Sequence, residues 1–100
     1  MFFFQIRGII DVSVKVDFVV NFGFMKVNRI DDYIRQANIV HNKIKGDMGR
    51  GLNIIYIKKP WKWRLNIEVE GDGDVVKEFL NQLRVHTVGL DVSPKNWYDI

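Results

Sequence analysis

Hydrophobic and polar residues alternate near the amino terminus of the chain. The alternation runs over 2–7 and again over 12–20, with Gly8 between the two stretches. Period-two alternation is typical of half-buried strands, and a glycine between two such stretches favours a bulge or bend. The segment 21–23, Asn-Phe-Gly, then predicts a three-residue hairpin loop that leads into a short strand over 24–27. We therefore expect an extra amino-terminal β-hairpin or extension before the main fold.

An alternating pattern of the same kind predicts a hairpin over 52–69. With a tight loop at its tip, this hairpin places Lys58 opposite Trp63. The same register pairs Tyr56 with Leu65, Ile54 with Ile67 and Leu52 with Val69. All of these apolar side chains then share one face of the sheet. The opposite face is polar except for Ile55 and Ile57.

Helical periodicity lies between these two regions. Apolar side chains recur at three- and four-residue spacing on one stripe, which consists of Ile30, Ile34, Ala37, His41 and Ile44. Asn28 precedes this stripe and can cap the first turn, whose dipole Asp31 and Asp32 complement. Gly46 follows the stripe and predicts the end of the helix. A glycine-rich connection over 46–51 then leads into the hairpin.

A second helix and a last strand complete the pattern. One side of a helix over 75–85 is apolar, through Val76, Phe79, Leu80 and Leu83. Asp72 or Asp74 caps this helix, and Gly89 precedes a final strand over roughly 90–98. Without the amino-terminal hairpin, the order is strand-helix-strand-strand-helix-strand. This is the split βαβ order of ferredoxin-like α+β folds, an antiparallel sheet with both helices on one face.

Length and composition fit one globular domain over 1–100, with 47% hydrophobic and 27% charged residues. The chain has no cysteine, which excludes thiolate catalysis and any cysteine-bearing zinc site and fits a reducing compartment. The first residues lack the basic leader and cleavage site of a signal peptide. No apolar run approaches the roughly 18 residues of a spanning helix, so we expect a cytoplasmic protein without a membrane partner.

Charge is unevenly distributed, although the net charge is only +3. Seven basic residues and one acidic residue lie between 43 and 64, whereas five acidic residues and one basic residue lie between 66 and 78. If both segments are exposed, the protein has a dipolar surface. The alternative is an ordinary solvated surface whose two blocks complement each other.

The basic block contains the most distinctive segment of the chain, Lys-Lys-Pro-Trp-Lys-Trp-Arg over 58–64. Clustered cations attract phosphates, and indole rings stack on unpaired bases. The candidate nucleic-acid-binding residues are Lys58, Lys59, Trp61, Lys62 and Arg64. In the alternative interpretation, Trp63 lies in the core, Trp61 packs on Pro60, and the cations serve only solubility.

Ile55 and Ile57 form the second candidate site, because a fully solvated face seldom carries two isoleucines. Exposed apolar patches mark contacts with other proteins, so these residues predict an interface and a homodimer. The alternative is that the amino-terminal extension, including Phe3, covers them within the same chain.

A weaker candidate is an anion site at the glycine-rich segment 46–51. Lys43, Lys45 and Arg50 would supply the charge, and the glycines would expose backbone amides. The segment lacks the strand-before-helix order and the Gly-Lys-Ser/Thr ending of a P-loop. A flexible connecting loop is the alternative.

The sequence offers no catalytic constellation and no metal or cofactor motif. His41 falls on the apolar stripe of the first helix and His86 near the end of the second, and neither has a nucleophile nearby in the sequence. The segment 71–74, Gly-Asp-Gly-Asp, lacks the later glycine and glutamate of a calcium loop. We expect neither a metal nor a cofactor.

The segment 63–90 resembles the strand-helix-strand half of acylphosphatase-type domains, through Glu70-Gly71 and the apolar helix positions that follow. The resemblance implies a phosphohydrolase whose glycine-rich loop carries a phosphate-binding arginine after the first strand. The corresponding segment here, Gly8-Ile9-Ile10-Asp11-Val12, contains no arginine. We therefore expect a small basic binding module rather than an enzyme, with nucleic acid as its first candidate partner and a second copy of the chain as the alternative.

Overall fold

Four strands pair into one antiparallel sheet in the order β2-β3-β1-β4. The computed structural model describes residues 13–48, 51–58 and 63–99, with Lys58 described by its backbone alone. The strands are β1 (Ser13–Asn21), β2 (Leu52–Lys58), β3 (Arg64–Asp72) and β4 (Asp91–Ser93). β3 lies between β1 and β2, and β1 lies between β3 and β4. This split βαβ connectivity confirms the predicted α+β class and is consistent with a ferredoxin-like arrangement.

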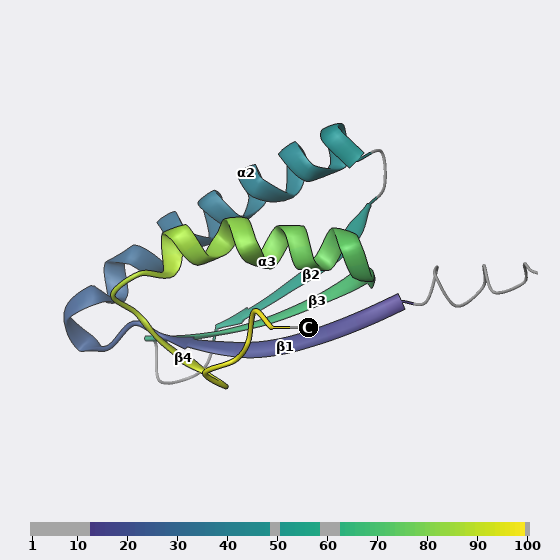
Figure 1. Cartoon of the computed structure of the whole chain (residues 1–100). Helices are drawn as coiled ribbons and strands as arrows, with labels where there is room; N and C mark the ends of the chain where they lie inside the picture. The colour runs from purple at the N-terminus through teal and green to yellow at the C-terminus, as the bar shows by residue number, and fades with distance from the viewer. Residues whose placement is uncertain (1–12, 49–50, 59–62, 100) are drawn as a thin grey trace, which may run out of the picture.

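Both helices, α2 (Ile30–Met48) and α3 (Gly73–Thr87), lie on the same face of the sheet (Figure 1). The core fills the space between the two layers, and its aromatic side chains are Phe18, Phe22, Tyr33, Phe79 and Trp97, packed with aliphatic ones that include Ile44, Leu65, Ile67, Leu80 and Leu83. The buried stripe of α2 consists of Ile30, Tyr33, Ala37, Val40 and Ile44, and Ile34 is only half-buried. No helix of the described residues lies on the opposite face of the sheet (Figure 1).

The predicted strand over 24–27 is wrong, because Phe24–Arg29 forms a short 3₁₀ helix, η1. A hairpin strand there would have to pair beside the end of β1. At that end both edges of β1 are occupied, because Asn21 pairs with Arg64 of β3 and with Asp91 of β4. The chain therefore turns at Gly23, whose φ is +73°, and leads into α2. The predicted extension before Ser13 lies outside the described residues.

The predicted ends of the first helix are also wrong. Asn28 lies within η1 rather than at a helix cap, and α2 begins at Ile30. Gly46 does not end the helix, which continues to Met48. Only Gly23 and Gly89 among the described glycines have a positive φ, so Gly46 does not adopt the left-handed conformation of a glycine C-cap.

The central hairpin has the predicted faces but a register shifted by two residues. Lys58 pairs with Leu65 rather than with Trp63, and Leu52 pairs with Gly71. Trp63 precedes β3, and its carbonyl oxygen accepts a hydrogen bond of 2.7 Å from the N–H of Phe22, the residue after β1. A shift of two residues keeps every side chain on its face, since side chains alternate along a strand.

The final strand is shorter than predicted. β4 ends at Ser93, and residues 94–98 form turns that place Trp97 against the core instead of extending the strand. Trp97 is buried, and its ring centroid lies 4.5 Å from that of Phe18. The expected strand over 90–98 is therefore wrong beyond Ser93.

Candidate nucleic-acid interface

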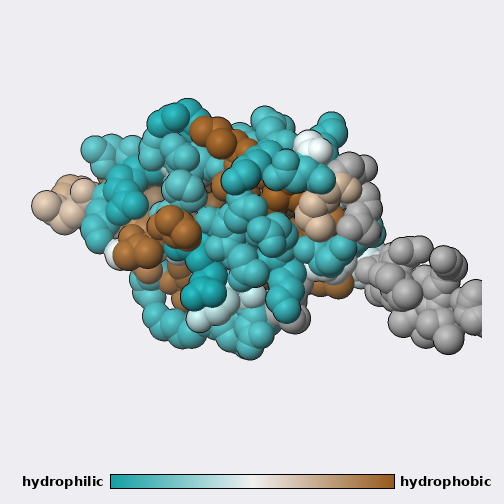
Figure 2. Space-filling model, turned by 45° about the horizontal axis from the view of Figure 1, so that its top comes forward, coloured by the Kyte–Doolittle hydropathy of each residue, from teal (hydrophilic) through white to brown (hydrophobic). Residues whose placement is uncertain are grey.

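Local hydrogen bonding shapes the end of the molecule where β1 leads into η1. The N–H of Gly23 donates to Oδ1 of Asn21 at 3.0 Å, and the positive φ of Gly23 reverses the chain. η1 then projects Phe24 and Met25, which are 74% and 85% exposed. Figure 2 shows hydrophobic side chains projecting from the left end of the molecule, the end that carries η1. Two large apolar side chains therefore face the solvent at one place.

The exposed Phe24 ring lies beside an indole from the central hairpin. Its centroid is 6.3 Å from that of Trp63, and the two rings are nearly perpendicular, at 89°. Trp63 is half-buried, and its backbone is held by the hydrogen bond from Phe22. Phe22 itself is buried edge-on against Tyr33. The Trp63 ring is thus held against the core, while the mostly exposed Phe24 ring leaves its surface open to contact.

Three basic residues belong to the same end of the molecule. Lys26 and Arg29 belong to η1, and Arg64 is the first residue of β3; all three are exposed. The ammonium of Lys26 also donates to the carbonyl of Gly89 at 2.8 Å, which ties η1 to the loop before β4. We call Phe24, Lys26, Arg29, Trp63 and Arg64 the basic-aromatic end.

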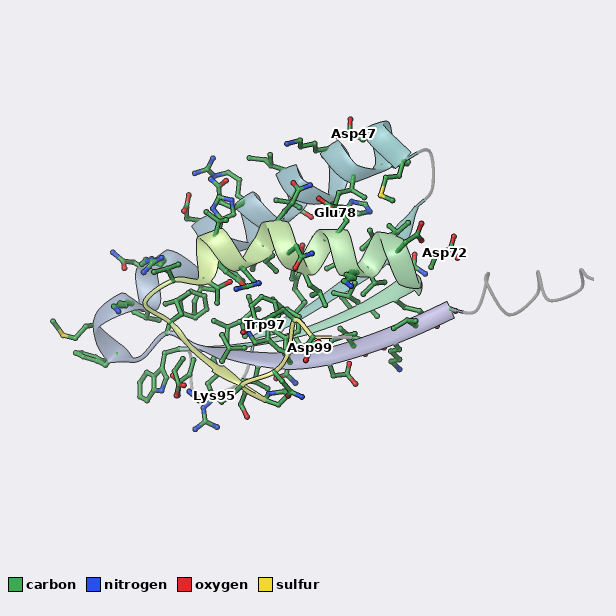
Figure 3. All side chains as sticks on the ribbon, in the orientation of Figure 1. Asp47, Asp72, Glu78, Lys95, Trp97 and Asp99 are labelled. Atoms are coloured by element: carbon green, nitrogen blue, oxygen red, sulfur yellow. The ribbon has the colours of Figure 1, made fainter. Side chains whose placement is uncertain are left out.

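Carboxylates lie at the opposite end of the molecule. Figure 3 shows Asp47 at the end of α2 and Asp72 at the end of β3, both far from η1. The η1 end is not free of carboxylates either, because Asp91 pairs with Asn21 there and Asp31 and Asp32 begin α2.

Only part of the predicted nucleic-acid site falls within the described residues. Lys58 ends β2, with its backbone paired to Leu65, and Arg64 begins β3 on the sheet's outward face. Lys59, Trp61 and Lys62 lie outside the described residues. The alternation of hydrophobic and polar residues did not predict Phe24 as a site residue, because it placed this residue on a strand rather than on the exposed side of a 3₁₀ helix.

The outward face of the sheet carries both isoleucines of the second candidate site. Ile55 and Ile57 are 49% and 48% exposed. Ile55 lies in one row with Glu68 and Asp17, and Ile57 lies in the next row with Asn66 and Val19. The two isoleucines therefore lie on the β2 side of this face, and Val19 of β1 lies across Asn66 from Ile57.

Acidic side chains dominate the rest of the outward face. Asp17, Glu68 and Glu70 lie on it, and the Lys15 ammonium bonds to Glu68 at 2.7 Å. That hydrogen bond and the charge of Glu68 raise the pKa of Lys15. This face has no aromatic residue among the described positions of its four strands. It therefore lacks the platform on which RNA-recognition modules stack bases.

A shallow hollow of about 330 Å³ opens on the outward face beside Asn66. Ile57, Val19 and Ser93 line it together with that amide. Oδ1 of Asn66 is buried without a hydrogen-bond partner. A buried acceptor of this kind is costly unless a donor reaches it.

Lys43 and Lys45 of the weaker anion site do not point the same way. Lys43 and Lys45 are exposed on α2, and residues two apart on a helix point to nearly opposite sides. Gly46 and Asp47 belong to the helix rather than to a loop. Arg50 lies outside the described residues.

The described residues contain no group of three metal-ligating His, Asp or Glu side chains. Nε2 of His41 lies 2.9 Å from the carbonyl oxygen of Leu52, a contact that joins α2 to β2. The segment 8–12, where the acylphosphatase resemblance would place its arginine loop, lies outside the described residues. No helix in the described part of the chain has both the length and the apolar character needed to span a membrane.

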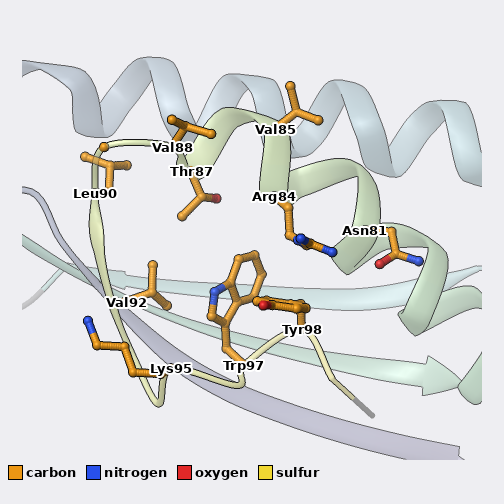
Figure 4. Close-up of a pocket in the computed structure, with 11 residues that line it drawn as sticks. Asn81, Arg84, Val85, Thr87, Val88, Leu90, Val92, Lys95, Trp97 and Tyr98 are labelled. Carbon is orange, nitrogen blue, oxygen red and sulfur yellow. The ribbon is translucent and has the colours of Figure 1, made fainter.

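A cavity of about 480 Å³ lies between α3 and the carboxyl-terminal turns (Figure 4). Trp97 and Tyr98 meet edge-on at 5.5 Å, and the Arg84 guanidinium lies 4.0 Å from the Tyr98 ring centroid. The other cation of the cavity, Lys95, bonds to Asp91 at 2.7 Å. Both cations thus have partners within the chain. The contacts of Trp97, Tyr98 and Arg84 hold the carboxyl-terminal segment on the core.

Comparisons with protein-family models, with curated proteins and with solved structures found no match to this chain.

Proposed function

We propose that this protein is a small binding module that takes up single-stranded nucleic acid at its basic-aromatic end. The observation that carries the proposal is the exposed Phe24 ring beside Trp63, at the same end of the molecule as the exposed cations Lys26, Arg29 and Arg64. Proteins that bind single strands combine cations along a groove with aromatic side chains on which bases stack. Both components meet at this end.

A single strand fits this end better than a duplex does. The 74% exposed Phe24 ring can stack only on a base that is not already stacked in a helix. The acidic outward face would repel phosphates, so the strand would avoid the sheet and follow η1 and the hairpin. The basic residues predicted at the hairpin tip, Lys59 and Lys62, would extend the same positive surface.

The proposal is tested with the full chain and a labelled, mixed-sequence single-stranded oligonucleotide, by fluorescence anisotropy over a range of salt concentrations. Phe24→Ala removes a stacking surface and should weaken binding by about 1–3 kcal/mol without changing the salt dependence. Arg64→Ala removes a phosphate contact. It should therefore lower the slope of log affinity against log salt by about 0.7.

Lys77→Ala is the matched control, because Lys77 is an exposed cation on the first turns of α3, away from η1. It should leave affinity and salt slope close to those of the unchanged protein. Absence of binding at low salt overturns the proposal. Equal losses in Arg64→Ala and Lys77→Ala would show nonspecific attraction to net charge instead of a site.

A second candidate function is protein binding through the outward face at Ile55 and Ile57. Two half-exposed isoleucines and the partnerless Oδ1 of Asn66 favour it, because a protein surface would cover the first and supply a donor to the second. Ile57→Lys should abolish the association without affecting folding. Ile39→Lys, at an equally exposed isoleucine of α2, should leave it intact. Circular dichroism and light scattering report both properties, and a complex that survives Ile57→Lys excludes this surface.

A further inference from the structure

β2 is an edge strand of the sheet, and its outer side is open among the described residues. β3 occupies one side of β2, and none of the described strands pairs with the other side. An open edge presents a row of backbone donors and acceptors that another strand can satisfy. A strand that pairs there is described by its identity and by its register.

The two edges of this sheet are built differently. At the far edge, β4 covers only Val19–Asn21 of β1; it is three residues long, begins with Asp91 and is followed at once by Pro94. The rest of that edge is β1 over Ser13–Phe18, which carries the charged residues Lys15 and Asp17. A short strand, a charge and a proline are the features that protect an edge from pairing. β2 has none of them over Leu52–Ile57, which is uncharged and contains no proline. The β2 edge is therefore suited to accept a strand.

The apolar side chains of β2 are exposed only on the outward face. On the helix side, Ile54 and Tyr56 are half-buried under α2, and the Tyr56 hydroxyl donates to Oδ1 of Asn38 at 3.3 Å. On the outward side, Ile55 and Ile57 remain about half exposed. A strand added at the β2 edge would bring new neighbours to these two side chains.

We propose that a second copy of the chain pairs its β2 with this edge, antiparallel about a two-fold axis through Ile55. This inference rests on the self-association that the second candidate function allows. Centring the axis on Ile55 pairs all seven residues from Leu52 to Lys58 with the same strand of the second copy. Ile55 then faces its own copy, Ile57 faces Asn53, and Lys58 faces Leu52, so no two like charges oppose each other.

The proposed contact buries little surface, which limits the affinity of the dimer. A single seven-residue ladder with two isoleucines from each copy buries less surface than a standard stable interface. The dimer should therefore dissociate at micromolar concentration. Light scattering of the full chain should show a rise from monomer to dimer mass as concentration increases. A monomer at every concentration up to the solubility limit overturns both the dimer and the self-association on which it rests.

Single cysteines test the register, because the chain has no cysteine of its own. Directly opposed residues of antiparallel strands have Cα atoms about 4.5–5.5 Å apart, within reach of a disulfide. Ile55→Cys should therefore form a covalent dimer under mild oxidation, detected on a non-reducing gel. Ile57→Cys should not, since its copy lies four residues away along the paired strand, roughly 13 Å.

Asp17→Cys is the control within the same row of the sheet. Asp17 lies two strands inward from Ile55, across Glu68, so the two copies of Asp17 would be roughly 24 Å apart in the proposed dimer. A dimer by light scattering in which Asp17→Cys cross-links indicates face-to-face packing and overturns the edge pairing alone. A dimer in which Ile57→Cys cross-links and Ile55→Cys does not overturns the two-fold position. Each variant should first show the circular dichroism of the unchanged protein.

Discussion

The hydrogen bond between Tyr33 and Thr87 joins the two helices inside the core. The two hydroxyl oxygens are 2.9 Å apart, and both residues are buried. The Thr87 hydroxyl donates to the carbonyl of Leu83 at 2.9 Å, so it accepts its second hydrogen bond from Tyr33. The roles of donor and acceptor are therefore fixed, and the two possible deletions are not equivalent.

Thr87→Val should cost more stability than Tyr33→Phe. The valine leaves the tyrosine hydroxyl buried without a partner, which costs about 1–3 kcal/mol. The phenylalanine removes only the donor to an oxygen that keeps its bond to Leu83, so it should cost about 1 kcal/mol. In the double variant no buried hydroxyl lacks a partner. The double variant should therefore lose less free energy of unfolding than the sum of the two single losses, by about 1 kcal/mol or more.

Urea denaturation followed by circular dichroism and by tryptophan fluorescence measures these free energies of unfolding. The slope with urea should be the same for all four proteins, which would show that the unfolded states are comparable. Single losses that add within about 0.3 kcal/mol would refute the argument. A smaller loss in Thr87→Val than in Tyr33→Phe would also refute it, because the donor would then lie on the other residue.

Three further outcomes follow from the packing of the helices and the sheet. A Cβ at Gly71 would lie 2.9 Å from Cβ of Leu52, so Gly71→Ala must separate β2 from β3 and should lower the free energy of unfolding by about 1–3 kcal/mol. Gly46→Ala meets nothing within 4 Å inside α2 and should raise that free energy by about 0.5–1 kcal/mol; a loss would show that the helix is strained there. Burial raises the pKa of Tyr33 and of Tyr56 to about 12, whereas the unfolded chain releases these protons near 10. Stability should therefore fall as pH rises from about 10 to 12, and Tyr33→Phe should make that fall shallower; an unchanged pH profile would contradict the role of Tyr33.

Side-chain alternation predicted the faces of the central hairpin but not its register. Leu52, Ile54 and Tyr56 share a face with Leu65, Ile67 and Val69, as the period of two requires. The register depends on where the loop ends, and here the Trp63 carbonyl accepts a hydrogen bond from Phe22, the residue after β1. That contact joins residues about forty positions apart, so no local pattern near the hairpin contains it.

Competition for a strand edge explains the larger error at residues 24–27. The alternation there fits a short strand, yet β3 and β4 already occupy both sides of β1 at Asn21. The segment turned into η1 instead, which exposed Phe24. Of the residues at the basic-aromatic end, the sequence predicted only Arg64 as a candidate nucleic-acid-binding residue. The exposed phenyl ring beside Trp63 depends on the order of the strands. The α+β class could be predicted because it depends only on the order of helices and strands along the chain.

The three pairs between β1 and β4 set a gradient of local stability across the sheet. β3 pairs with β1 along all nine residues of that strand, whereas β4 pairs only with Val19–Asn21. Opening of β4 breaks few backbone hydrogen bonds, so it requires less free energy than unfolding of the β1–β3 pair. Amide hydrogens of β4 should therefore exchange with solvent faster than those at the centre of β3. Each such opening would lift Trp97 off Phe18 and expose the edge of β1 at Val19–Asn21.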